Sequence, residues 1–196
     1  MNAATQRNLA WKLNWWRQSE LEGALLLGRM VGMAEDGDLA AKLVRHSAEE
    51  AEHSRMWADV LAELELPHIR IFRSYQSFYL QHSGPPGRLL EVLAFTRIFE
   101  LRVHARFSDE LHRRETPEPA RLAYRQMIHE EKGHLAWVAA WLRGQPEAAG
   151  ALARYRAIDR AVFAELAPYG SRLWEVPGLG REHVPSPTLS LKTSNP

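Results

Sequence analysis

The sequence predicts an all-α protein, in which two antiparallel helical hairpins joined by a long crossover form a four-helix bundle. A short fifth helix and an irregular C-terminal tail follow. Two observations predict this class. Apolar residues recur at helical spacing in four long stretches. Turn-forming segments divide these stretches into two pairs, with short links within each pair and one long link between them. The predicted domain covers residues 1–167, and the tail, rich in Pro, Gly and Ser, covers 168–196.

The first hairpin consists of two long helices. The first is predicted over residues 5–34, and Gly37 is expected to end it because glycine adopts the left-handed conformation found after helices. Asp38 is expected to cap the second helix, which is predicted over 39–64. Pro67 ends this helix because proline cannot continue the hydrogen-bond ladder.

The second hairpin follows the crossover, which covers residues 66–87 and is long enough to run the length of the bundle. A third helix is predicted over 88–113. Thr116 is expected to cap the fourth helix, predicted over 117–143, which has proline at its first position. A fifth helix is predicted over 146–166. The short links make each pair of helices antiparallel neighbours.

Composition excludes several classes of function. The net charge of +1 gives no sign of the basic surface typical of a nucleic-acid-binding protein. The absence of cysteine excludes disulfides, thiolate catalysis, zinc ribbons and iron–sulfur clusters. The longest apolar run is far shorter than the roughly 20 residues that cross a bilayer, so no membrane association is expected. Because no signal peptide is recognised, the expected location is the cytoplasm.

A repeated motif carries the functional signal. Glu-Glu-x-x-His occurs at residues 49–53 and again at 130–134, and a lone glutamate precedes each copy, Glu20 the first and Glu100 the second. A single Glu-x-x-His means little, but only about 0.1 copies of the longer motif are expected by chance in a chain of this composition. Two helical hairpins that each carry a Glu and a Glu-x-x-His can close a dinuclear metal site.

Helical periodicity selects the inward-facing members of each motif. The second glutamate and the histidine lie on the apolar stripes, as do both lone glutamates, whereas Glu49 and Glu52 point away and are expected to be solvated. Four buried carboxylates would repel one another and cost several kcal/mol each. Two divalent cations would neutralise them, and oxygen and nitrogen ligands suit iron or manganese. The alternative is a structural network of satisfied polar groups.

These residues resemble the ligand set of the ferritin-like di-iron carboxylate superfamily, which includes rubrerythrins and di-iron oxidases. The resemblance covers residues 10–143 in motif order, spacing and crossover position. It implies two iron ions, with Mn/Fe or Mn/Mn pairs also compatible. The lone glutamates would each bind mainly one metal, the motif glutamates would bridge both, and each histidine would complete one metal. The implied metal ligands are Glu20, Glu50, His53, Glu100, Glu131 and His134.

The resemblance implies a site that reacts with dioxygen or a peroxide. Storage ferritins usually lack the second motif histidine, and rubrerythrins carry cysteine-rich modules, whereas this chain has His134 and no cysteine. It therefore resembles di-iron oxidases and oxygenases that oxidise a small organic substrate with electrons from a separate donor protein. The alternatives are a ferroxidase, a rubrerythrin-like peroxide-detoxifying protein and a non-catalytic helical interaction module. A homodimer is the default expectation.

Four neighbouring residues are expected to support the ligands. His46 and His104 each lie one helical turn from a ligand and are expected to orient a carboxylate, the alternative being an extra metal ligand. Arg97 is expected to pair with a ligand carboxylate, or else to bind an acidic group of the substrate. Tyr124 is either a redox-active phenol near the metals or a core residue. Aromatic residues of the crossover either cover the pocket or serve packing and dimer contacts.

Overall fold

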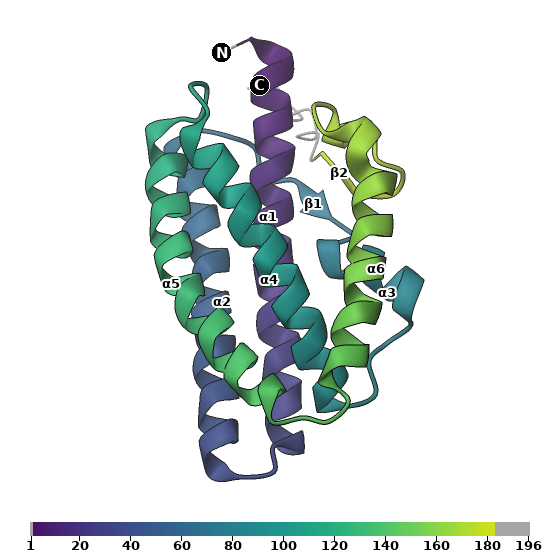
Figure 1. Ribbon diagram of the computed structural model, residues 1–196. Coiled ribbons are helices and arrows are strands. Elements are labelled where there is room, and N and C mark those ends of the chain that lie inside the picture. The colour runs from purple at the N-terminus through teal and green to yellow at the C-terminus, as the bar shows by residue number, and fades with distance from the viewer. Residues whose placement is uncertain (1, 183–196) are drawn as a thin grey trace, which may run out of the picture.

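Two antiparallel helical hairpins form the body of the molecule, as predicted. The computed structural model describes residues 2–182 and contains six α-helices over this range (Figure 1). Helix α1 (Ala3–Met30) pairs with α2 (Gly37–Glu63), and α4 (Leu89–His112) pairs with α5 (Glu118–Arg143). Helices α2 and α5 also contact each other, so the two hairpins share one interior.

The link between α1 and α2 differs in detail from the prediction. A short 3-10 turn, Val31–Met33, follows α1. The cap of α2 is Asp36, not Asp38, because its side chain accepts a hydrogen bond from the backbone N–H of Leu39 at 2.7 Å. Gly37 is already the first residue of α2 and does not end α1. Extended backbone at Asp36 brings its carboxylate over the free N–H groups of the first turn.

The crossover contains a helix that the sequence prediction missed. Strand β1 (Arg70–Ile71) is followed by α3 (Tyr75–Ser83). Ser74 caps α3, with its hydroxyl accepting from the N–H of Ser77 at 3.3 Å, and Gly84 ends it at φ 68°. These two caps were the available signal, but nine residues are too few for apolar periodicity to separate a helix from a loop. Helix α3 contacts α1 and α6.

The start of α5 also differs from the prediction. Pro117 holds the cap position with extended backbone, and no side chain of residues 2–182 caps the helix. The hydroxyl of Thr116 instead donates to the Glu110 carbonyl at 2.7 Å, at the end of α4. Thr116 therefore secures the turn between α4 and α5 and does not cap α5.

The last part of the described chain closes over the bundle. Helix α6 (Ala148–Leu166) packs on α4 and α3, and two 3-10 turns follow, Ala167–Tyr169 and Leu173–Glu175. Strand β2 (Gly180–Arg181) then pairs antiparallel with β1. A Cβ atom at position 180 would lie 2.5 Å from the Arg70 carbonyl oxygen, so this pairing requires glycine. The remainder of the predicted irregular tail, 183–196, lies outside the described residues.

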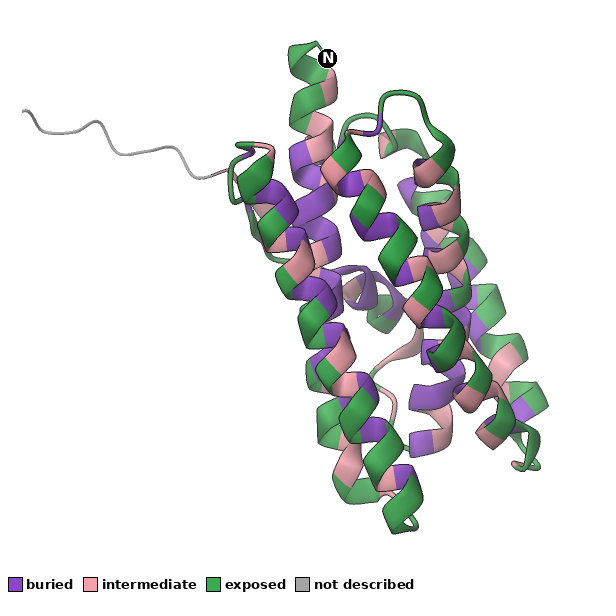
Figure 2. Ribbon diagram, turned by 90° about the vertical axis from the view of Figure 1, so that its left-hand side faces the viewer, coloured by how far each residue is buried: buried purple, intermediate pink, exposed green. Residues whose placement is uncertain are grey.

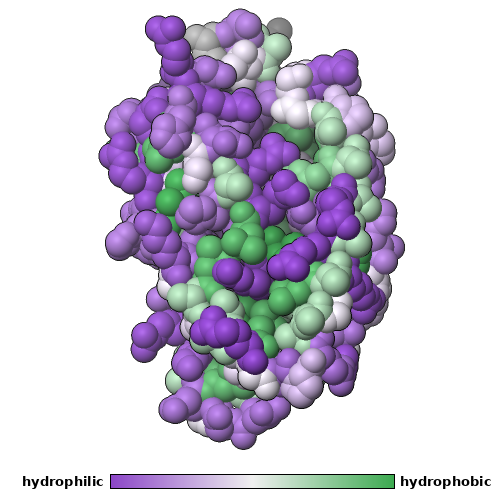
Figure 3. All heavy atoms as spheres, viewed as in Figure 1, coloured by the Kyte–Doolittle hydropathy of each residue, from purple (hydrophilic) through white to green (hydrophobic). Residues whose placement is uncertain are grey.

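Buried residues line the inner faces of all the long helices (Figure 2). Trp15 stacks on Tyr75 of α3 with ring centroids 3.8 Å apart, and Trp57 packs edge-on to Phe107 at 5.6 Å. On the face that α4, α5 and α6 present, hydrophilic residues surround a smaller hydrophobic area (Figure 3). Over the described residues, no helix is long and apolar enough to cross a membrane.

Candidate metal centre

Seven buried acidic and histidine side chains converge from all four long helices. Helix α2 supplies three of them because residues four and three positions apart share one helix face. None of the seven is more than 6% exposed, although each carries polar atoms into the core: Glu20 on α1, His46, Glu50 and His53 on α2, Glu100 on α4, and Glu131 and His134 on α5. All six predicted ligands are therefore brought together, with His46 beside them.

The ligand atoms fall into two groups that could each hold a metal ion. Within each group, the potential ligand atoms all lie within 4.8 Å of one another: Glu20, Glu50 and His53 in the first, and His46, Glu50, Glu100 and His134 in the second. Glu50 belongs to both groups. Two neighbouring cation positions that share a carboxylate are what a dinuclear centre in a helical bundle requires.

Glu131 lies between the two groups. Its Oε1 is 3.6 Å from Nδ1 of His53, and its Oε2 is 3.4 Å from Nδ1 of His134. The two carboxylate oxygens therefore face the histidines of different groups. This is the arrangement expected of a carboxylate that bridges two metals.

Several of these buried polar atoms have no hydrogen-bond partner within residues 2–182. They are one oxygen each of Glu100 and Glu131, and the Nδ1 atoms of His46, His53 and His134. Unpaired buried polar atoms are rare in folded proteins and call for an explanation. Convergent carboxylate oxygen and imidazole nitrogen atoms are common ligands of divalent metal ions. The residues present could therefore hold metal ions.

Each motif histidine is oriented by the first glutamate of the other motif. Nε2 of His53 lies 2.9 Å from Oε2 of Glu130, and Nε2 of His134 lies 2.7 Å from Oε2 of Glu49. When Nε2 donates to the carboxylate, Nδ1 keeps its lone pair for a metal. The Glu49 side chain is 46% exposed, as expected, but it also bonds to His134 across the bundle, a contact that the sequence did not predict. Glu52 is exposed, as expected, and pairs with Arg55.

We expect Glu49→Ala and Glu130→Ala each to weaken binding of one metal. Removing a carboxylate that orients a ligand histidine typically lowers metal affinity about 10- to 100-fold. Glu49→Ala should affect the group that contains His134, and Glu130→Ala the group that contains His53. Titration of the metal-free protein with Fe²⁺ or Mn²⁺ should show one of two binding steps weakened in each variant. Glu52→Ala is the matched control, and equal affinities in all three variants would contradict the assignment.

Burial and neighbouring charges move the pKa values of the buried carboxyl groups in different directions. Burial raises the pKa of Glu20 well above its usual value, and the adjacent Glu50 raises it further. Burial and Glu50 likewise raise the pKa of Glu131 to about 7. Burial also opposes ionisation of Glu50, but the adjacent imidazoles of His134 and His46 outweigh it, so that its pKa falls well below the usual value. The carboxylate shared by both groups is therefore more firmly ionised than those of Glu20 and Glu131.

The same burial and the neighbouring carboxylates also shift the pKa values of His46 and His134. Burial by itself lowers the pKa of His46, but the charges and hydrogen bonds of Glu100 and Glu50 raise it to about 9. Burial also opposes protonation of His134, whereas Glu131 and Glu50 raise its pKa to about 12. Without metal, protons on these groups balance the carboxylates. Divalent cations would supply the same positive charge.

His46 is the one predicted supporting residue that joins the cluster. Its Nε2 lies 2.9 Å from Oε1 of Glu100 and 3.1 Å from Oε1 of Glu50, and its ring stacks on His134 with centroids 3.7 Å apart. It therefore either donates a hydrogen bond to the two carboxylates or, after losing that proton, offers the second group a second imidazole beside that of His134.

The other three supporting residues lie elsewhere. Arg97 was expected to pair with a ligand carboxylate, but its guanidinium donates to the Leu135 carbonyl at 3.1 Å, and His46 takes the place beside Glu100. His104 is half-buried and belongs to neither ligand group. The Tyr124 ring packs against Trp57 and Phe107, and its hydroxyl has no hydrogen-bond partner among the described residues.

Two spaces adjoin the cluster on different sides. A cavity of about 20 Å³ lies between α1, α3 and α4, where Glu20, Glu50, Glu100 and Glu131 meet apolar side chains such as Phe99. A groove of about 520 Å³ runs between α2 and α5 and reaches His46 and His134 from outside. The small cavity holds about one water-sized molecule, whereas the groove has the volume of a site for an organic ligand.

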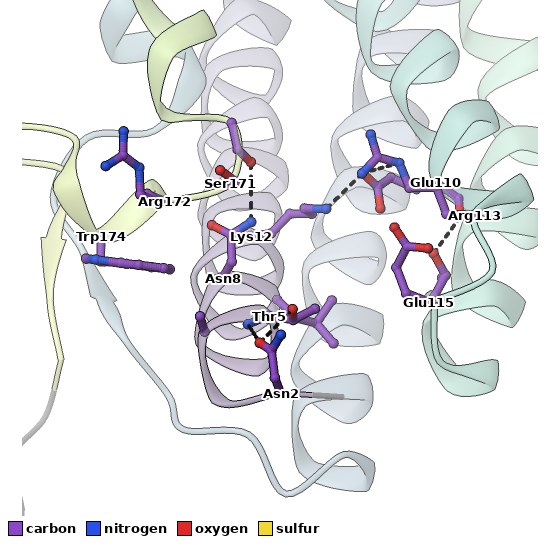
Figure 4. Close-up of a pocket in the computed structure, with 14 residues that line it drawn as sticks. Asn2, Thr5, Asn8, Lys12, Glu110, Arg113, Glu115, Ser171, Arg172 and Trp174 are labelled. Carbon is purple, nitrogen blue, oxygen red and sulfur yellow. Dashed lines mark hydrogen bonds and ion pairs between the residues drawn. The ribbon is translucent and has the colours of Figure 1, made fainter.

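A further cleft of about 440 Å³ lies at the N-terminal end of α1, away from the cluster (Figure 4). Its charged groups are mostly paired with one another. Lys12 reaches across to Glu110 at 2.8 Å, and Arg113 also approaches Glu110, at 3.6 Å (Figure 4). Lys12 precedes Glu20 by about 12 Å of helix rise. The cleft therefore plays no part in the candidate centre.

Comparison of the chain with models of protein families, with curated protein sequences and with solved structures finds no match. The buried His/Glu cluster could hold metal ions, and the case for this rests on its geometry: two groups of donor atoms that share Glu50.

Proposed function

We propose that this protein is a non-haem oxidoreductase with a dinuclear iron centre that reacts with dioxygen or a peroxide. The observation that carries the proposal is the convergence of three carboxylates and three imidazoles in two groups that share Glu50, with the Glu131 carboxylate between them and several of the atoms unpaired. A structural network would satisfy its own hydrogen bonds, because unpaired buried atoms are unfavourable.

The residues divide into distinct roles in this proposal. Glu20 and His53 would hold one iron, Glu100 and His134 the other, and Glu50 and Glu131 would lie between them. When bound, iron would supply the electrons that reduce dioxygen or a peroxide. Glu49 and Glu130 would keep the histidines in the tautomer that leaves Nδ1 free.

The small cavity supports the choice of co-substrate. It lies on the carboxylate side of the cluster, opposite the groove that reaches the histidines, and its apolar walls come from α1 and α4. Its volume of about 20 Å³ suits a molecule of the size of water, dioxygen or hydrogen peroxide. The walls would also exclude bulk water from the reacting atoms.

Oxidation of an organic substrate remains our preferred form of this function. The cavity is too small for such a substrate, but the groove between α2 and α5 is large enough and reaches His46 and His134. Two further points stay predictions: that a separate protein donates the electrons, and that the protein forms a homodimer. Peroxide reduction is the second candidate, and the size of the cavity favours it because a peroxide needs no larger site.

The test begins with metal content of the protein purified without added metal. We expect about two iron ions per chain. The fully reduced protein, mixed with either oxygen or hydrogen peroxide, should then change its absorbance within a single turnover. Faster reaction with hydrogen peroxide than with oxygen would favour peroxide reduction. Absence of bound metal, together with no gain in melting temperature when iron or manganese is supplied, would contradict the proposal and leave a helical interaction module.

A further inference from the structure

The helix that the sequence did not predict brings a polar side chain to the small cavity. Gln76 of α3 is 5% exposed and lines this cavity beside the carboxylates. Its Nε2 donates to the Ser19 carbonyl at 2.8 Å. A carbonyl oxygen accepts only from the nitrogen side of an amide, so this bond fixes the orientation of the group. Oε1 of Gln76 is then a buried acceptor, and it has no partner in the described part of the chain.

Gly23 keeps space open at the same place. A Cβ atom at position 23 would lie 3.5 Å from Oε2 of Glu50 and 3.7 Å from Nε2 of Gln76. Gly23 therefore borders both the carboxylate that the two metal groups share and the amide from α3. Both contacts would be at ordinary van der Waals distance, so a methyl group fits without a clash but fills part of a cavity of only about 20 Å³.

The chemistry of the cavity limits the ligand that it favours. Its charged groups are carboxylates, and its other walls are largely hydrocarbon. The unpaired Oε1 of Gln76 can be satisfied only by a ligand that carries a hydrogen to donate. Hydrogen peroxide and water carry such a hydrogen, whereas dioxygen and the azide ion do not.

We propose that Gln76 is a positioning residue that accepts a hydrogen bond from a small O–H-bearing ligand, hydrogen peroxide or water, and that Gly23 sets the size limit of this ligand site. The inference rests on the proposed metal centre and adds to it a site for the ligand and a preference between ligands. It concerns a helix outside the two predicted hairpins.

Gln76→Met tests the hydrogen bond because methionine has a similar length without a strong acceptor. The probes are hydrogen peroxide and azide, each titrated into the oxidised, iron-loaded protein and followed by absorbance. We expect the half-saturating concentration of hydrogen peroxide to rise about 10-fold, the usual effect of losing one hydrogen bond. That of azide should change less than about 2-fold, because azide donates no hydrogen bond.

Gly23→Ala tests the size limit in a variant that is expected to fold well, because alanine favours helix more than glycine. Both probes should bind roughly 10-fold more weakly, since the methyl group takes the space of the ligand. Gly150→Ala is the matched control: position 150 lies inside α6, outside the metal cluster, and a Cβ atom there meets nothing within 4 Å among the described residues. It should leave the affinity for both probes unchanged.

The outcomes separate this inference from the proposed function. Wild-type protein that binds no iron would contradict the proposed function itself. If the wild-type protein binds iron, and both Gln76→Met and Gly23→Ala bind hydrogen peroxide as tightly as the wild type does, only the inference is overturned. Equal loss of azide and hydrogen peroxide binding in Gln76→Met would also overturn it, because a general packing defect would then explain the change.

Discussion

Glu50→Ala is expected to abolish binding of both metal ions, whereas loss of a ligand that serves one metal should remove only one. The reason is that Glu50 belongs to both groups of donor atoms. Metal that binds only the folded state stabilises it by about 4 kcal/mol when present at 1,000 times its dissociation constant. The variant should lose this gain. Metal content by elemental analysis, and melting temperature with and without Fe²⁺ or Mn²⁺, are the measurements.

The matched control for this prediction is Glu52→Ala, on the same helix. Glu52 is exposed and pairs with Arg55, so its loss should change neither metal content nor the metal-dependent stability. Metal-free Glu50→Ala must be compared with metal-free wild type, because Glu50 also accepts a hydrogen bond from His46 at 3.1 Å. Retention of one metal per chain in Glu50→Ala would contradict the shared position of this carboxylate.

Asp159→Ala is expected to lower the free energy of unfolding by about 2–4 kcal/mol. Asp159 is 7% exposed and joins three helices. Its carboxylate accepts from the Tyr79 hydroxyl of α3 at 2.6 Å and pairs with Arg102 of α4. Burial and Asp159 together raise the pKa of Tyr79, so the phenol stays a donor. The variant leaves a buried hydroxyl and a partly buried guanidinium without their partner.

Chemical denaturation of the metal-free proteins measures this effect without the contribution of bound metal. The Arg102 side chain is 36% exposed, so water can solvate its guanidinium in part once the ion pair with Asp159 is lost. The unpaired Tyr79 hydroxyl should therefore account for much of the change in stability. Asp159→Asn keeps an acceptor for Tyr79 and should be destabilised less than Asp159→Ala. Exposed Asp109→Ala is the surface control and should change stability by less than about 0.5 kcal/mol. A similarly small change in Asp159→Ala would contradict the role of this carboxylate.

The sequence by itself determined the two hairpins and the inward faces of their helices. A helix turns by a fixed angle per residue, so the spacing of Glu50 and His53 places both on the apolar face before any partner is known. Short links made each pair antiparallel. These are local properties of the chain, and for this reason Glu20, Glu100 and the two motifs were found before the fold was known.

The tertiary structure alone decided which groups meet across the bundle. Helical phase gives the face on which Glu49 lies but not the side chain that it reaches, and its bond to His134 depends on how α2 and α5 pack. In the same way, His46 and not Arg97 lies beside Glu100, because the position of a side chain between helices depends on packing. Helix α3, which carries Gln76, also depended on tertiary structure. Its nine residues are too few to show helical periodicity in the sequence, and its position is set by contacts with α1 and α6.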